Sequence, residues 1–172
     1  MPVTVVSPRK TCYHHVVKSS PWNEPRIVKW SRLLLDSYRH WTGKDLIGRT
    51  PDEIQQARLL FGASFVVVSH GVETDPVLNY GNQAALELWE LSWDQFIRTP
   101  SRLTAEADDR AERETMLESA KLNGYFRGYR GVRISSTGKR FLVEDALIWN
   151  VFDSAGRSIG QAATFSQWSN LS

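Results

Sequence analysis

The spacing of apolar residues divides the chain into a helical first third and a strand-rich last third. Over 24–41, apolar side chains recur every three or four residues, which predicts an amphipathic helix with one buried stripe. Asn23 is the expected cap at its start, and Gly43 closes its end. Thr50 and Glu53 form a capping-box pattern, which predicts a second helix with Thr50 as its N-cap.

The middle of the chain alternates between strands and short helices. The segments 64–69 (SFVVVS) and 77–80 (VLNY) have the length and composition of strands. Asn82 is the expected cap of the helix that follows, and Ser92 begins a further capping box. An amphipathic helix is expected over about 105–122, with an acidic start and a basic end that suit the helix dipole.

Three strands separated by turn sequences make up the last third. The strands are expected over 125–135, 139–152 and 157–168. The full order is helix, helix, then β-β-α-α-α-β-β-β, which predicts an α+β fold with a five-stranded antiparallel sheet, helices on one face and an N-terminal helical extension. The expected parts are a flexible basic segment over 1–22, the helical extension over 23–62 and the sheet domain over 63–170.

Two blocks of the sequence resemble the PAS family. PVLNYGNQAALELWELSWDQF, over 76–96, resembles the PAS pattern in which a strand ends in Asn and two helices follow. The block over 128–168 resembles the three-stranded PAS hairpin with its D-x-x-G turn. The stretch 24–168 is similar to the MEKHLA family of PAS-related domains, and ALIWN and GQAATFSQW are its most specific parts. The resemblance implies a PAS-like fold and regulation by a ligand or a partner, with no established chemistry.

Both faces of the predicted strand 139–152 are mostly apolar, so both should be covered. Matching its turn to the PAS hairpin puts the polar residues Glu144 and Asn150 on the pocket side. Two interpretations of Glu144 stay open: it pairs with Arg130 or Arg133 on the adjacent strand, or it orients a ligand together with Asn150. The candidate ligand-binding residues are Tyr80, Trp89, Tyr129, Glu144, Ala146, Ile148, Asn150, Ala162 and Thr164.

The opposite face of the same strand carries Leu147 and Trp149 and needs a second cover, because an exposed face of this kind would be a large apolar patch. The apolar stripe of the first helix is the candidate cover, from the same chain or from a dimer mate. A protein partner or a homodimer is therefore expected. The candidate interface residues are Trp30, Leu34, Tyr38, Trp41, Leu147 and Trp149.

Cysteine and histidine positions argue against two known PAS cofactors. The only cysteine, Cys12, lies outside the predicted core, so a covalent flavin adduct is not expected. None of the four histidines falls on the helices after Asn82, where haem-binding PAS domains place an axial ligand, so haem is not expected. Cys12 with His14 and His15 lacks acidic partners, and no metal site is expected. The identity of any cofactor stays unknown.

Charge and apolar runs bear on partners and location. Residues 1–50 carry nine Lys/Arg and three Asp/Glu, but no dense basic stripe, so nucleic acid is not the expected partner. A third hypothesis nevertheless gives Arg9, Lys10 and Lys18 a salt-sensitive role in nucleic-acid binding. No apolar run approaches the ~20 residues of a membrane span. A cytoplasmic location is expected, and organellar import stays open because the first 20 residues lack acidic side chains.

The leading hypothesis is a regulatory PAS-like module that binds a small molecule, a protein partner or both. It would signal through its N-terminal helix or through a dimer interface. An enzyme is not expected, since the sequence contains no Walker loop, dinucleotide fingerprint or nucleophile elbow. The alternative is a small isomerase or hydrolase with Glu144 as general base, which would need a pKa raised by burial.

Overall fold

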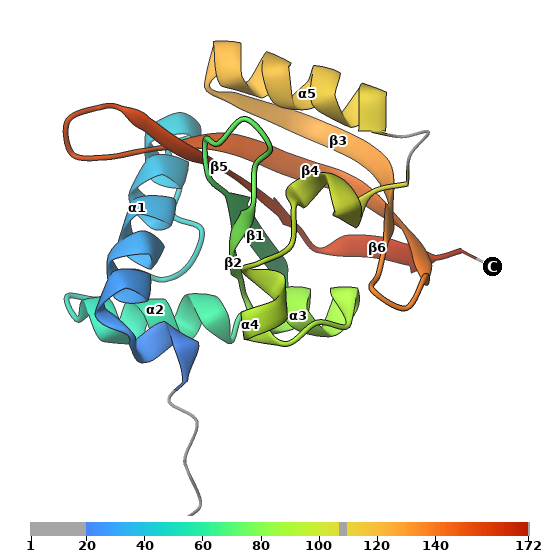
Figure 1. Cartoon of the computed structure of the whole chain (residues 1–172). Helices are drawn as coiled ribbons and strands as arrows, with labels where there is room; N and C mark the ends of the chain where they lie inside the picture. The colour runs from blue at the N-terminus through green and yellow to red at the C-terminus, as the bar shows by residue number, and fades with distance from the viewer. Residues whose placement is uncertain (1–19, 107–109, 172) are drawn as a thin grey trace, which may run out of the picture.

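A six-stranded antiparallel sheet forms the centre of the computed structural model, which describes residues 20–106 and 110–171 (Figure 1). The helices are η1 Pro21–Asn23, α1 Pro25–Thr42, α2 Glu53–Phe61, α3 Gln83–Trp89, α4 Trp93–Phe96, η2 Ser101–Thr104 and α5 Arg110–Asn123. The strands are β1 Val66–His70, β2 Leu78–Gly81, β3 Tyr125–Ile134, β4 Arg140–Phe152, β5 Ser158–Phe165 and β6 Gln167–Asn170. The expected basic segment over 1–22 lies almost wholly outside the described residues. None of the described helices is long and apolar enough to cross a membrane.

The sheet confirms the predicted α+β architecture and has one strand more than expected. Its order is β2-β1-β5-β4-β3, and every paired strand is antiparallel. The strand expected over 157–168 is two strands, because β5 ends at Phe165 and β6 begins at Gln167. The long strand β4 pairs with β5 along its second half and with β6 along its first half.

A β-bulge at Asp145 interrupts the alternation of side chains along β4. Asp145 has a φ of 52°, in the left-handed region of the backbone map. The pairing with β6 ends at Glu144, and the pairing with β5 begins at Leu147. The extra residue shifts all later side chains by one position. Ala146 therefore packs in the same cluster as Val143, two residues before the bulge, instead of sharing a face with Glu144.

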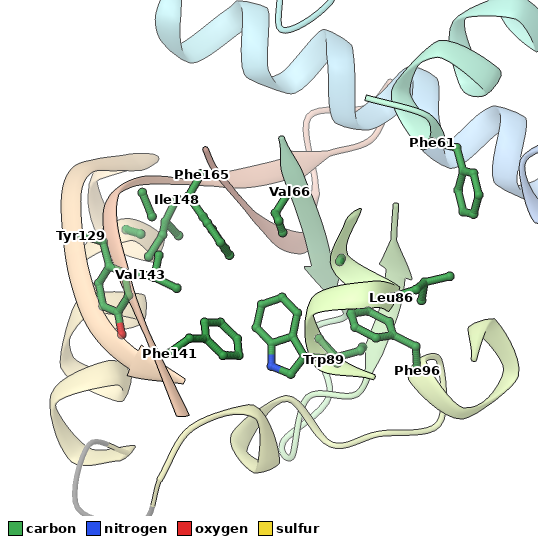
Figure 2. Packing of buried hydrophobic residues seen from close by; sticks show 14 residues of the cluster. Phe61, Val66, Leu86, Trp89, Phe96, Tyr129, Phe141, Val143, Ile148 and Phe165 are labelled. Carbon is green, nitrogen blue, oxygen red and sulfur yellow. The ribbon is translucent and has the colours of Figure 1, made fainter. Parts of the chain in front are cut away.

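Each face of the sheet has its own apolar cluster. On the face covered by α3, α4 and α5, the Trp89 indole contacts the ring of Phe141 edge-on, with 5.2 Å between ring centroids (Figure 2). On the other face, Trp149 is wholly buried and contacts the Tyr38 ring of α1, also at 5.2 Å. Both faces of β4 are thus covered, and the second cover is α1 of the same chain.

Local capping sequences fix several helix ends as predicted. Asn82 caps α3 by accepting a hydrogen bond from the Ala85 backbone N–H at 3.2 Å. Ser92 and Gln95 form the predicted capping box at the start of α4. Gly43 ends α1 in the left-handed conformation, with a φ of 72°.

Two predicted N-caps are wrong. α1 begins after Glu24, because Asn23 is held in the preceding turn η1. α2 begins after Asp52, not Thr50, because the Asp52 carboxylate accepts hydrogen bonds from the backbone N–H groups of Ile54 and Gln55.

Candidate ligand cavity

A partly enclosed cavity of about 60 Å³ lies between the sheet and the helices α3, α4 and α5. This volume holds a few water molecules or a small organic molecule. Its apolar walls come from both the sheet and the helices. They are Val68, Leu78, Trp89, Phe96, Leu117, Tyr129, Val143, Ala146, Ile148, Ala162, Ala163 and Phe165.

Five of the nine predicted ligand-binding residues line this cavity: Trp89, Tyr129, Ala146, Ile148 and Ala162. Figure 2 shows how Trp89 of α3 faces the side chains of β3 and β4 across the apolar cluster. Ala146 and Ile148 follow the bulge, so they point inward. The aromatic wall expected from Trp89 is therefore present, and these residues stay candidates for ligand contact.

The structure places Glu144 outside the cavity, so its prediction as a ligand-binding residue is wrong. Its side chain is 44% exposed and lies 3.4 Å from the guanidinium of Arg130. Arg130 lies on β3 between Tyr129 and Gly131, opposite the two residues of the bulge. The bulge at Asp145 turns Glu144 away from the face that carries the cavity. The pairing with Arg130 is the interpretation that the structure supports, and the enzymatic alternative loses its general base.

Tyr80 and Thr164 also lie away from the cavity. Tyr80 packs wholly buried in the cluster under α1 and α2, where burial raises the pKa of its hydroxyl. On β5, Ala163 pairs with Ile148 of the cavity face, and Thr164 pairs with Leu147 of the opposite face. Thr164 instead donates a hydrogen bond to the Val66 carbonyl at 2.8 Å. The predicted phase of β5 was therefore one residue out, and Ala162, although it borders the cavity, pairs with Trp149 and packs in the cluster of the opposite face.

Asn150 is buried beside the cavity and makes structural hydrogen bonds. Its side-chain N–H donates to the Lys121 carbonyl at the end of α5, at 3.0 Å. Its side-chain oxygen accepts from Gln161 on β5, at 3.3 Å. Gln161 also donates to the Leu117 carbonyl at 3.0 Å, and it does line the cavity. Asn150 thus joins β4 to α5 next to the cavity wall.

The sequence reasoning missed the charged edge of the cavity, which Arg113 of α5 provides. Only 8% of this residue is exposed, and its guanidinium donates to the hydroxyl of Ser101. Burial, reinforced by the nearby positive charge of Arg133, lowers the pKa of Arg113 to about 10, so the side chain stays charged at neutral pH. Leu117 and Ala120 lie on one apolar stripe of α5, and Arg113 lies one turn before Leu117 on the same side of the helix. This spacing is the signal that could have predicted that Arg113 points inward.

A second arginine lies on the adjacent strand. Arg133 of β3 donates to the Tyr129 hydroxyl at 2.5 Å, and its guanidinium carbon lies 5.0 Å from the centre of the Tyr129 ring. Both residues line the cavity. The Tyr129 hydroxyl is thereby held at the polar edge of the site.

His70, at the end of β1, also lines the cavity. Its Nδ1 lies 2.7 Å from the Gly71 carbonyl oxygen, which assigns the ring proton to Nδ1. Burial lowers the pKa of the imidazole more than the carbonyl of Gly71 raises it, so the ring is neutral at pH 7. Residues 20–106 and 110–171 contain no cluster of three side chains suited to a metal ion.

The expected interface residues are packed against one another within the chain. Trp30 donates to the Ser69 hydroxyl of β1 at 2.9 Å, and Trp41 donates to the Asn150 carbonyl of β4 at 2.9 Å. Leu34 is wholly buried in the same cluster. The stripe of α1 is therefore the cover of its own sheet.

The cavity does not fit a flavin or a haem. Sites that enclose ligands of that size occupy on the order of 300–1,000 Å³, several times the volume present. Cys12, the only sulfhydryl group, lies outside the described residues, as do His14 and His15.

Known structures share this fold at low sequence identity. A PAS domain of a protein from Colwellia psychrerythraea is 13% identical with a TM-score of 0.57, over 68% of this chain and 94% of that chain. An RNA-binding light-oxygen-voltage receptor is 20% identical with a TM-score of 0.59, over 72% of this chain and 36% of that chain. A light-oxygen-voltage domain studied with a flavin analogue is 13% identical with a TM-score of 0.54, over 69% and 85% of the two chains. These similarities show a PAS fold.

A search of curated protein sequences found no match. The sequence model of the MEKHLA domain matches residues 28–170, a span that runs from α1 to the end of β6 and contains every cavity residue described above. The match agrees with the resemblance carried by ALIWN and GQAATFSQW. The chain belongs to the MEKHLA domain family.

Proposed function

We propose that this MEKHLA domain is a sensory module that holds a small molecule in the cavity and signals through α1. The observation that carries the proposal is the cavity itself. It is a mostly apolar space with a few polar groups at one edge, which is the usual composition of a small-molecule site. The similarity to PAS and light-oxygen-voltage structures supports a sensory role without supplying the ligand.

A short path of hydrogen bonds supports α1 as the output. Gln161 lines the cavity and donates to the side chain of Asn150. The backbone carbonyl of Asn150 accepts from the Trp41 indole of α1. A ligand that shifts Gln161 would therefore act on the strand to which α1 is attached. A protein partner that reads the position of α1 would complete the signal.

The third hypothesis, nucleic-acid binding, rested on residues at the N-terminus. Arg9, Lys10 and Lys18 lie outside the described residues. No observation in residues 20–106 and 110–171 favours this hypothesis, and it forms no part of the proposal.

Native mass spectrometry tests the proposal on protein purified without added ligand. We expect a small mass that is present in the native spectrum and lost on denaturation. Ala163→Leu fills the cavity from β5 and should abolish this mass, and Ala163→Val is a smaller change that should reduce it. Ala111→Leu makes the same substitution at an exposed position of α5 and should retain it. A bare polypeptide in all four proteins would contradict the proposal.

A further inference from the structure

The buried guanidinium of Arg113 forms no ion pair with a carboxylate of residues 20–106 and 110–171, although the charge of Glu114 acts on it weakly. In the described part of the chain, no Asp or Glu side chain forms an ion pair with it, and its hydrogen bond goes to the neutral hydroxyl of Ser101. Burying an uncompensated charge is costly, and the like charge of Arg133 adds to the cost. A bound anion would offset this cost.

The neighbouring wall also offers an unused donor. The indole N–H of Trp89 is buried and has no hydrogen-bond partner in the part of the chain that the structure describes, although the ring forms part of the cavity wall. Buried donors of this kind normally have an acceptor. A ligand with acceptor oxygens would therefore meet donors that the protein itself leaves unsatisfied.

We infer that the cavity binds a small aliphatic monocarboxylate, with its carboxylate on Arg113 and its apolar tail against the walls formed by Ile148 and Phe165. This inference rests on the proposed function and names the class of its ligand. The planar guanidinium fork matches a carboxylate in geometry as well as in charge.

The shape of the site favours a carboxylate over phosphate. The lining is mostly apolar and the charge lies at one edge, so a ligand with one charged end and one apolar end fits it. A phosphate would place oxygens in every direction, including toward Ile148 and Phe165. The small volume limits the tail to a few carbon atoms.

An open groove of about 600 Å³ gives this edge a route to solvent. The groove runs between α5 and the connection from β1 to β2, and it shares four residues with the cavity: His70, Arg113, Leu117 and Gln161. Arg113 therefore stands where the groove and the cavity meet. The groove is lined by four carboxylates, Glu73, Asp75, Glu114 and Glu118, as well as by Arg102 and Lys121, so Arg113 rather than the groove as a whole supplies the anion-binding charge.

The test uses the straight-chain acids from formate to valerate, added to the full chain after it has been unfolded and refolded to remove small molecules. At least one acid should raise Tm by on the order of 2–4 °C at saturating concentration, while its primary amide and sodium phosphate at equal ionic strength should not. Arg113→Gln should weaken binding of that acid at least about tenfold by calorimetry. Arg113→Lys should retain part of the affinity, and Arg98→Gln, at an exposed arginine, should retain all of it.

Other results would overturn the inference. If the amides stabilise the protein as well as the acids do, or if phosphate alone stabilises it, the ligand is not a carboxylate, while the proposed binding function stands. If no acid binds and the native spectrum shows a retained small mass, the inference alone fails. If no acid binds and no mass is retained, both the inference and the proposed function fail.

Discussion

The indole N–H of Trp41 donates a hydrogen bond of 2.9 Å to the backbone carbonyl of Asn150. This bond fastens α1 to β4 at the residue whose side chain reaches α5 and Gln161. Gly124, whose backbone carbonyl accepts from the Asn150 N–H, packs under the Trp41 ring, where a side chain would have no room. Asn150 thus contacts both α1, which covers one face of the sheet, and Gln161, which lines the cavity on the other face.

Trp41→Phe should remove this hydrogen bond and keep an aromatic ring against the sheet. We expect the free energy of unfolding to fall by about 1–2 kcal/mol, the loss of one buried hydrogen bond with some packing. Urea denaturation measures it. Tyr38→Phe is the control, because its ring contact with Trp149 survives the change. If Trp41→Phe is as stable as the unmodified protein, the hydrogen bond from Trp41 to Asn150 does not hold α1 to β4.

Glu144→Gln should have little effect, because the side chain is half exposed and its pairing with Arg130 is a surface ion pair. We expect a change within about 0.5 kcal/mol and an unchanged retained mass. Asn150→Ala removes buried hydrogen bonds and should cost about 1–3 kcal/mol. The two variants compared by urea denaturation test the placement of the bulge. A large loss in Glu144→Gln, with the mass also lost, would restore Glu144 to the cavity.

The contrast between Glu144, which lies outside the cavity, and Asn150, which lies beside it, shows which features the sequence could predict. Local signals are reliable here: the caps at Asn82 and Ser92 depend on neighbouring backbone groups, and both are found in the structure. The faces of β4 after the bulge were also predicted, so Trp149 lies under α1 as expected. The prediction that side chains alternate strictly along β4 was wrong at Glu144, because Asp145 takes a left-handed backbone conformation. No glycine beside Asp145 indicates this bulge in the sequence.

Long-range features of the site were beyond the sequence reasoning. The phase of β5 depends on its register with β4, which pairs Ala163 rather than Thr164 with Ile148. The burial of Arg113 depends on which face of α5 packs against the sheet. From the sequence, a charged residue in a helix rich in charges is predicted to be exposed. In retrospect, the apolar stripe through Leu117 indicates the inward side of α5.

Arg113→Met should leave the ligand-free protein as stable as before, or more stable by about 1–4 kcal/mol, because it removes a buried charge that has no ion pair among the described residues and keeps most of the volume. The comparison by urea denaturation uses protein that has been refolded to remove small molecules. Arg98→Met, at an exposed site, should change stability by no more than about 0.5 kcal/mol. A loss of more than about 2 kcal/mol in Arg113→Met would mean that the protein itself already compensates the charge.

The carboxylate of Glu90 is expected to make a contribution to the free energy of unfolding that is lost in acid. Hydrogen bonds from Thr137, Ser135 and Lys139 lower the pKa of its carboxyl from 4.5 to about 2 and tie the end of α3 to the turn between β3 and β4. A lowered pKa in the folded state stabilises the protein above the pKa of the unfolded chain, and this contribution is lost as pH falls from about 4.5 to about 2.

The stability difference between the unmodified protein and Glu90→Gln should therefore be constant above about pH 5 and shrink as pH falls toward 2. Urea midpoints at several pH values measure this difference. Asp94→Asn, at an exposed position of α4, is the control and should show no such trend over the same range. A difference that grows with acidity would contradict the assignment.

The central claim is that α1 responds to what the cavity holds, and hydrogen–deuterium exchange of α1 tests it most directly. The protein as purified is compared with the same protein after unfolding and refolding have removed its small molecules, and Ala163→Leu serves as the control. The account predicts that α1 amides around Trp41 exchange more slowly in the protein as purified, with no such difference in Ala163→Leu. Identical exchange of α1 in both preparations, from protein whose native spectrum shows a bound small mass, would contradict it.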